Sequence, residues 1–271
     1  MSILNSSIYS IPIEDMGFRV IFGGFGTGKG TTSAIYAIFE MRDKNRFMNS
    51  ILSICDLQEK LNRTFNLPPQ NHVVYSDFKV IDKNKSTYDC DPNMFMLPNE
   101  ELEYQLFVPW ACIHFEEFHS SIFCSYEWSK LPKAALNASS RVRKPHFLIT
   151  LDLQRLKTFN VNLRDNCFEY ITPLSIENEF NCLNQLVKTT VNLAVFHICE
   201  KAEEFENTKN LDLTDEIRPL IFKGNIRKCF DTNSKYLDFF DCDSDFCFSK
   251  EELKKYMKKH EDKVVKEIIE C

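Results

Sequence analysis

The chain has 271 residues, of which 44% are hydrophobic and 24 are phenylalanine, so it can form one α/β domain with a large core and an appendage. A net charge of −6 argues against a protein that coats nucleic acid, and eleven scattered cysteines without zinc-site spacing indicate reduced thiols. No apolar run approaches the roughly 18 to 20 residues that cross a bilayer, and the acidic N-terminal stretch is no secretory signal, so we expect a cytoplasmic protein without a membrane span.

Five of the seven glycines lie within eight residues, in a loop after the apolar run 18–23. The run predicts a buried strand, and apolar residues at helical spacing after the loop predict a helix over 29–42. The spacing Gly23-x4-Gly28-Lys29 between strand and helix is that of a phosphate-binding P-loop, in which backbone N–H groups and the helix N-terminus face a phosphate. The sequence therefore predicts that ATP binds through Gly23, Gly24, Phe25, Gly26, Thr27, Gly28, Lys29, Gly30, Thr31 and Thr32.

The residue after Lys29 departs from the usual pattern. A Ser or Thr there would place a hydroxyl on Mg²⁺, whereas this chain has Gly30, followed by Thr31. We therefore expect Thr31 to act, indirectly, on the magnesium side of the site. The string Gly-Lys-Gly-Thr also resembles the loop of adenylate kinase and other nucleoside monophosphate kinases, and this makes a small-molecule kinase an alternative function.

Strands and helices alternate up to about residue 180, which predicts an α/β fold of the P-loop NTPase type with a central, mostly parallel sheet flanked by helices. Further strands are expected over 72–75, 109–115, 146–153 and 168–172, and further helices over 46–63 and 125–139. The polar stretch 82–100 is expected to be an insertion or a long loop. Candidate DNA contacts in this stretch and just before it are Lys79, Lys83 and Lys85, although Asp77, Asp82 and Asp89 largely cancel their charge.

Three segments can be separated along the chain. We expect a P-loop ATPase core over 1–180 and a C-terminal part of the core, or an accessory region, over 181–245. The tail 246–271 has Ser249 and Glu252 in capping-box position, followed by apolar residues at helical spacing. It is therefore predicted to form an amphipathic terminal helix, which makes a small C-terminal α-rich extension.

The strand predicted over 109–115 ends in two adjacent carboxylates, Glu116 and Glu117. A P-loop ATPase needs an acidic residue at the end of a neighbouring strand to hold Mg²⁺, and often a second one to polarise the attacking water. We expect Glu116 on the metal side and Glu117 at the water. Glu116 stands where Asp is usual, so its longer arm is a second departure in the magnesium site. A solvated acidic turn is the alternative for this pair.

Gln154 follows the strand predicted over 146–153 and is placed to contact the γ-phosphate or the water. Arg143 lies eleven residues before it and Arg164 ten after it. This arrangement, with the segment 228–232 further on, resembles the N-terminal ATPase domain of zonular occludens toxin-like (Zot-like) proteins of filamentous phages, which are P-loop DNA motors of the FtsK/HerA type. Leu153 stands where the family has Thr.

The resemblance implies a ring, a hexamer, in which an arginine of one subunit reaches the γ-phosphate of its neighbour. The candidates for this arginine are Arg141, Arg143 and Arg164, and an ordinary surface salt bridge is the alternative for each. Members of the phage family usually carry a membrane span after the ATPase domain. Because no such span is found in this sequence, a viral packaging or plasmid-transfer ATPase fits better than an extrusion protein.

The leading hypothesis is an ATP-hydrolysing DNA translocase or packaging motor for virion morphogenesis, from a virus or mobile element. Its cofactors would be ATP and Mg²⁺, and its partners DNA and further copies of the chain. The metal side would be held by Thr31 and Glu116, and the catalytic residues would be Lys29, Glu117, Gln154, Arg143 and Arg164. The alternatives are a nucleotide-binding assembly protein with little turnover, because of Gly30 and Glu116, and a nucleoside monophosphate kinase-like phosphotransferase.

Overall fold

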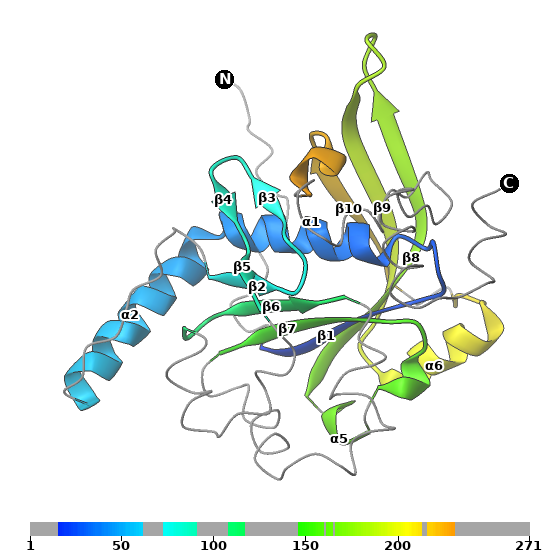
Figure 1. Ribbon diagram of the computed structural model, residues 1–271. Helices are drawn as coiled ribbons and strands as arrows, with labels where there is room; N and C mark the ends of the chain where they lie inside the picture. The colour runs from blue at the N-terminus through cyan, green and yellow to red at the C-terminus, as the bar shows by residue number, and fades with distance from the viewer. Residues whose placement is uncertain are drawn as a thin grey trace, which may run out of the picture. The chain divides into compact units, whose positions relative to one another are not determined.

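The computed structural model describes residues 16–61, 73–90, 108–116, 146–159, 161–164, 166–212 and 216–230. Within these ranges eight strands form one sheet, in the order β10-β9-β8-β1-β7-β6-β2-β5 (Figure 1). The strands of this sheet are β1 (Gly17–Phe22), β2 (Val74–Ser76), β5 (Tyr88–Asp89), β6 (Cys112–Phe115), β7 (Leu148–Leu153), β8 (Cys167–Phe180), β9 (Leu186–Phe196) and β10 (Glu216–Lys223). A separate hairpin is formed by β3 (Ile81–Asp82) and β4 (Lys85–Ser86). The helices are α1 (Lys29–Arg42), α2 (Lys44–Leu61), α5 (Val161–Arg164) and α6 (Cys199–Thr208), with short 3₁₀ turns η5 (Leu156–Thr158) and η6 (Ile226–Cys229).

The central strand β1 runs parallel to both of its neighbours, β7 and β8. The sheet continues in parallel through β6, β2 and β5 on one side, and in antiparallel through β9 and β10 on the other. The carboxyl ends of β1, β7 and β6 therefore meet at one edge of the sheet. This arrangement confirms the predicted α/β class with a mostly parallel sheet. Among the helices that the structure describes, none is both long and apolar enough to cross a membrane.

Most elements predicted from the sequence before residue 173 are present, and α1 has the predicted bounds. The strand expected over 168–172 is much longer than predicted, and β9 and β10 were not predicted. From residue 174 onward β8 is exposed. Apolar residues at 174, 176 and 180 still alternate with polar ones, and this strand signal was not used in the prediction. The polar stretch from residue 82 is not simply a loop, because its described part contributes to β3, β4 and β5. The helices predicted over 125–139 and 246–271 lie outside the described residues.

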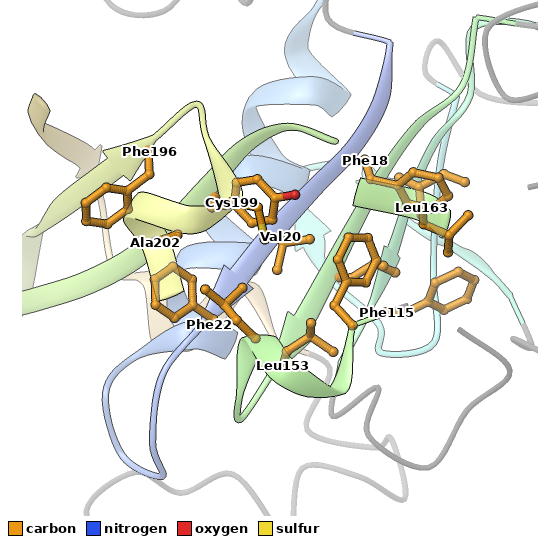
Figure 2. Packing of buried hydrophobic residues seen from close by; sticks show 14 of the residues in the cluster. Phe18, Val20, Phe22, Phe115, Leu153, Leu163, Phe196, Cys199 and Ala202 are labelled. Atoms are coloured by element: carbon orange, nitrogen blue, oxygen red, sulfur yellow. The ribbon is translucent and has the colours of Figure 1, made fainter. Parts of the chain in front are cut away.

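One face of the sheet carries the apolar core. Successive strand residues point to opposite faces, and Phe18, Val20 and Phe22 of β1 point to the same one. They pack with residues of the neighbouring strands, among them Leu153, and with α6, as Figure 2 shows for Cys199 and Ala202. All of these side chains are almost entirely removed from water. The core fixes α6 on this face and leaves the other face to α1.

The face of the sheet that packs against α1 holds buried charges instead. Arg19 lies between two carboxylates from distant elements: its Nε donates to Glu169 of β8 at 2.6 Å and its Nη1 donates to Glu40 of α1 at 2.9 Å. The guanidinium also lies 4.1 Å from the ring centroid of Tyr36. Burial by itself would lower the pKa of Arg19, but Glu169 and Glu40 outweigh it and raise that pKa. Arg19 therefore stays charged and joins α1 to β1 and β8.

This buried network extends in both directions from Arg19. Glu40 also accepts a hydrogen bond from His114 Nε2 of β6 at 2.6 Å, and His114 Nδ1 lies 3.2 Å from Ser33 Oγ of α1. On the other side, Glu169 accepts a bond at 2.9 Å from Arg218 of β10. The contacts thus connect α1 with strands from both halves of the sheet. We call the residues Ser33, His114, Glu40, Arg19, Glu169 and Arg218 the buried ion network.

Removal of Arg19 should strongly destabilise the fold. The substitution Arg19→Met leaves Glu40 and Glu169 buried without their shared cation, and breaking a buried pair in this way costs about 3–5 kcal/mol. Urea unfolding of the purified chain measures the loss. Lys60→Met is the matched control, because the Lys60–Asp56 pair is exposed and should leave the unfolding midpoint unchanged. A loss below about 1 kcal/mol in Arg19→Met would contradict the role given to Arg19.

Acid should weaken the fold through Glu40. Burial alone would raise the pKa of Glu40, but His114 and Arg19 outweigh it and lower the pKa from 4.5 to about 2. A carboxylate with a lowered pKa stabilises the folded state above its unfolded pKa, and this contribution is lost as the pH falls toward its folded pKa. Between about pH 5 and about pH 3 the unfolding midpoint of the wild type should therefore fall further than that of Glu40→Gln. Parallel curves for the two proteins would contradict this assignment.

Candidate nucleotide site

The glycine loop lies between the carboxyl end of β1 and the first turn of α1, as the P-loop spacing predicts. Its start is tied to the next strand, because the Gly23 N–H donates to the Leu153 carbonyl of β7 at 3.1 Å. The loop is closed by two side chains that donate to the same carbonyl, that of Gly24: Thr27 Oγ1 at 2.9 Å and Lys29 Nζ at 3.0 Å. Lys29 therefore folds back over the loop, with its ammonium at the Gly24 carbonyl.

The loop presents unpaired backbone donors. Within the described part of the chain, the N–H groups of residues 24–28 donate no hydrogen bond, and the first N–H of α1 with a helical partner is that of Thr32, which bonds the Gly28 carbonyl at 2.9 Å. The N–H groups of Lys29, Gly30 and Thr31 precede it in the first turn, where helices have no internal acceptor. A row of free donors beside a lysine and a helix N-terminus fits the oxygens of a phosphate chain. Strand, glycine loop and helix together have the geometry of a P-loop.

Gly28 cannot be replaced without strain. Its φ of +90° lies in the left-handed region, and a Cβ built on it would come within 2.2 Å of Ile176 Cδ1. Ile176 belongs to the exposed part of β8, beyond the residues that pair with β1. The loop is therefore held in shape on two sides, by its own backbone conformation and by a strand that was not predicted to extend so far.

Glu116 lies at the same edge as the loop. It follows β6, and both oxygens of Asp77, which follows β2, accept a hydrogen bond from its backbone N–H, at 3.0 and 3.1 Å. The Asp77 N–H in turn donates to the His114 carbonyl at 3.2 Å. The Glu116 side chain reaches the first turn of α1, where its Oε1 lies 2.5 Å from the position of a Cβ built on Gly30. The structure thus brings Glu116 and the loop together.

The remaining predicted residues are placed as follows. Thr31 is half-buried in the first turn of α1, and Thr32 is buried with its hydroxyl bonded to the Gly28 carbonyl at 2.8 Å. Gln154 directly follows β7, next to the carbonyl that accepts from Gly23, so its backbone lies at the start of the loop. Glu117, Arg141 and Arg143 lie outside the described residues.

Arg164 lies at the other end of β1. It ends α5, two residues before Asn166, whose carbonyl accepts a hydrogen bond from the Phe18 N–H at 2.9 Å. The six residues of β1 separate this point from the loop by about 20 Å. Arg164 also pairs with Glu203 of α6, with 2.7 Å between Nη1 and Oε1. It is therefore too far from the loop to act on a phosphate bound by its own chain.

One of the three lysines proposed to face DNA makes a contact within the chain. Lys85 Nζ donates to the Met41 carbonyl at 2.9 Å, near the C-terminal end of α1. In the same hairpin, Asp82 accepts two hydrogen bonds from Arg42, both of 2.7 Å. The hairpin therefore holds the last turn of α1, about 20 Å along the helix from the loop.

Sequence reasoning missed three residues that shape the site: Asp77, His114 and Ile176. Asp77 counted only as a charge among lysines, although its place two residues after the strand predicted over 72–75 was a signal for the sheet edge. His114 is a fully buried polar residue in an apolar strand two residues before Glu116, and that position was a signal of a buried partner. The contact of Ile176 with Gly28 had no signal, because it joins segments far apart in the chain.

No protein-family model and no curated protein matches the chain. Solved structures do. The N-terminal domain of zonular occludens toxin from Neisseria meningitidis is 14% identical over 79% of this chain and 98% of its own, with a TM-score of 0.45. The genome packaging NTPase B204 from Sulfolobus turreted icosahedral virus 2, in complex with ATP-gammaS, is 10% identical over 74% of this chain and 96% of its own, with a TM-score of 0.36.

A further structure, described as B204, the DNA-packaging ATPase from Sulfolobus Turreted Icosahedral Virus, is 10% identical over 74% of this chain and 96% of its own, with a TM-score of 0.35. The first of these structures, the zonular occludens toxin domain, bears the name of the family that the sequence motifs resemble. All three TM-scores are below 0.5.

Replacement of Gly28 by alanine should destabilise the free protein. Alanine in the left-handed region costs about 1–2 kcal/mol, and its Cβ also collides with Ile176. The matched control is Gly24→Ala, because a Cβ on Gly24 meets no atom within 4 Å. Urea unfolding should show a loss for Gly28→Ala and none for Gly24→Ala. Adding Ile176→Ala to Gly28→Ala should recover only part of the loss, and full recovery would contradict the backbone strain.

Proposed function

We propose that this chain is an ATPase that couples hydrolysis of the γ-phosphate to the movement of DNA. The observation that carries the nucleotide part is the row of unpaired N–H groups in the loop 24–28, with Lys29 over it and Glu116 at its edge. Backbone N–H donors, an ammonium and a helix N-terminus attract phosphate oxygens, and a carboxylate beside them can hold the accompanying cation.

In the proposed reaction, Lys29 leaves the Gly24 carbonyl and binds the β- and γ-phosphates together with the loop N–H groups. Magnesium, when bound, neutralises charge on the phosphate oxygens. Glu116 lies on the proposed magnesium side of the site, with Thr31 acting there only indirectly, and the carboxylate oxygen that lies against Gly30 fits a hard cation. Glu117 orients the attacking water, and Gln154 contacts the γ-phosphate.

The DNA part of the proposal rests on the sequence motifs around Arg143, Gln154 and Arg164, which resemble those of Zot-like motors. The position of Arg164 agrees with the proposed action in trans, because that residue is about 20 Å from the loop of its own chain. Such an action requires a ring and requires Arg164 to exchange Glu203 for a phosphate of the neighbouring subunit. Arg143 is the second candidate.

Phosphate release from ATP tests the proposed function. Wild-type turnover should rise when single- or double-stranded DNA is added, and the more effective strand identifies the substrate. Lys29→Ala and Glu117→Gln should each lower turnover at least about 100-fold, since both groups act on the transition state. The control Lys201→Ala changes an exposed lysine of α6 and should behave like the wild type.

Two outcomes would favour the alternative functions. Turnover that appears only when a nucleoside monophosphate is added would indicate a kinase, as the Gly-Lys-Gly-Thr string suggests. Tight ATP binding without phosphate release under any condition would indicate an assembly protein that uses the nucleotide as a ligand. Turnover that DNA leaves unchanged would contradict the proposed coupling to DNA.

A further inference from the structure

The two departures of the magnesium site from the common pattern touch each other in space. Gly30 lacks the hydroxyl that Ser or Thr would supply, and Glu116 is one methylene longer than the usual Asp. A Cβ on residue 30 would lie 2.5 Å from Glu116 Oε1 and 3.5 Å from its Cδ. The carboxylate of Glu116 therefore fills the space that a side chain at position 30 would need.

The backbone of Glu116 is held firmly relative to α1. Its N–H is bonded to both oxygens of Asp77, and the strand that precedes it is pinned to α1 through His114, which contacts Ser33 and Glu40. Ser33 lies three residues after Gly30, on the same side of the helix. From this fixed backbone position, the side chain of Glu116 is long enough to bring its carboxylate to Gly30.

We infer that Glu116 replaces the missing hydroxyl and is itself the direct protein ligand of the nucleotide-bound magnesium, with Gly30 required to make room for it. The inference rests on the proposed nucleotide binding. Mg²⁺ takes oxygen ligands at short range and is commonly bound through one or two carboxylates, and the Oε1 atom lies 2.5 Å from where the Cβ of a side chain on residue 30 would lie. Thr31 is then not needed as a ligand.

A carboxylate at this place has a second consequence. Without metal, its negative charge faces the phosphates and opposes nucleotide binding, whereas a hydroxyl would be neutral. With metal, the same charge favours binding. Nucleotide affinity should therefore depend on Mg²⁺ more strongly than with a hydroxyl ligand, and the dependence should disappear when the carboxylate is neutralised.

The test is calorimetric titration of the full chain with a non-hydrolysable ATP analogue, once with Mg²⁺ and once with EDTA. The ratio of the two affinities is the readout, and it does not depend on turnover. The wild type should gain at least about tenfold from Mg²⁺. Glu116→Gln should lose this gain and bind the analogue in EDTA at least as well as the wild type. Thr31→Ala should keep the full gain.

A second pair of variants tests whether Gly30 and Glu116 act through their contact with each other. Gly30→Thr should displace the Glu116 carboxylate and lower the Mg²⁺ gain, although it restores the common pattern of the loop. Combining Gly30→Thr with Glu116→Asp shortens the arm beside the new hydroxyl and should recover the gain. Thermal unfolding of each variant shows whether it is folded, and the near-isosteric Glu116→Gln keeps the test decisive if Gly30→Thr does not fold.

The inference is overturned if Glu116→Gln keeps the Mg²⁺ gain, or if folded Gly30→Thr alone shows the full gain. It is also overturned if Thr31→Ala loses the gain. A wild type that binds no analogue with Mg²⁺ or with EDTA contradicts the proposed nucleotide binding itself. A wild type that binds equally well in both contradicts only the metal ligand.

Discussion

The ion pairs of Arg19 hold the first helix and the sheet in one arrangement. Glu40 and Glu169 are both buried and would repel each other. The guanidinium of Arg19 lies between them and attracts both carboxylates, which compensates this repulsion. Because Glu40 lies near the C-terminal end of α1, the pairing fixes the line of the helix across the sheet. The first turn of α1, with Lys29 and Gly30, then faces the edge where β1, β7 and β6 end.

The same network reaches the acidic side of the site. His114 joins β6 to α1 at Glu40 and Ser33. Two residues after His114, the backbone N–H of Glu116 donates to Asp77. The longer carboxylate of Glu116 is accommodated because the residue opposite, Gly30, has no side chain. Gly30 and Glu116 each depart from the usual P-loop pattern in the sequence. In the structure the two departures fit together, because the Glu116 carboxylate occupies the space that a side chain at position 30 would need.

The loop and α1 could be predicted because their signals are local: glycines at fixed spacing, an apolar run before them and helical periodicity after them. Arg19 gave no such signal, since its partners Glu40 and Glu169 lie 21 and 150 residues away and it reads as a polar interruption in a strand. The extension of β8 with β9 and β10 was missed because backbone pairing stabilises it where the side chains are exposed. The contact of Glu116 with Gly30 depends on how two elements cross, which no spacing reveals.

A structure of the full chain with Mg²⁺ and a non-hydrolysable ATP analogue would decide whether the loop is a nucleotide site. The phosphates should lie along the N–H groups of residues 24–30, and Lys29 Nζ should have moved from the Gly24 carbonyl to a phosphate oxygen. The Glu116 carboxylate should bind the metal beside Gly30. An analogue bound elsewhere, with Lys29 still on the Gly24 carbonyl at saturating concentration, would contradict the proposed site.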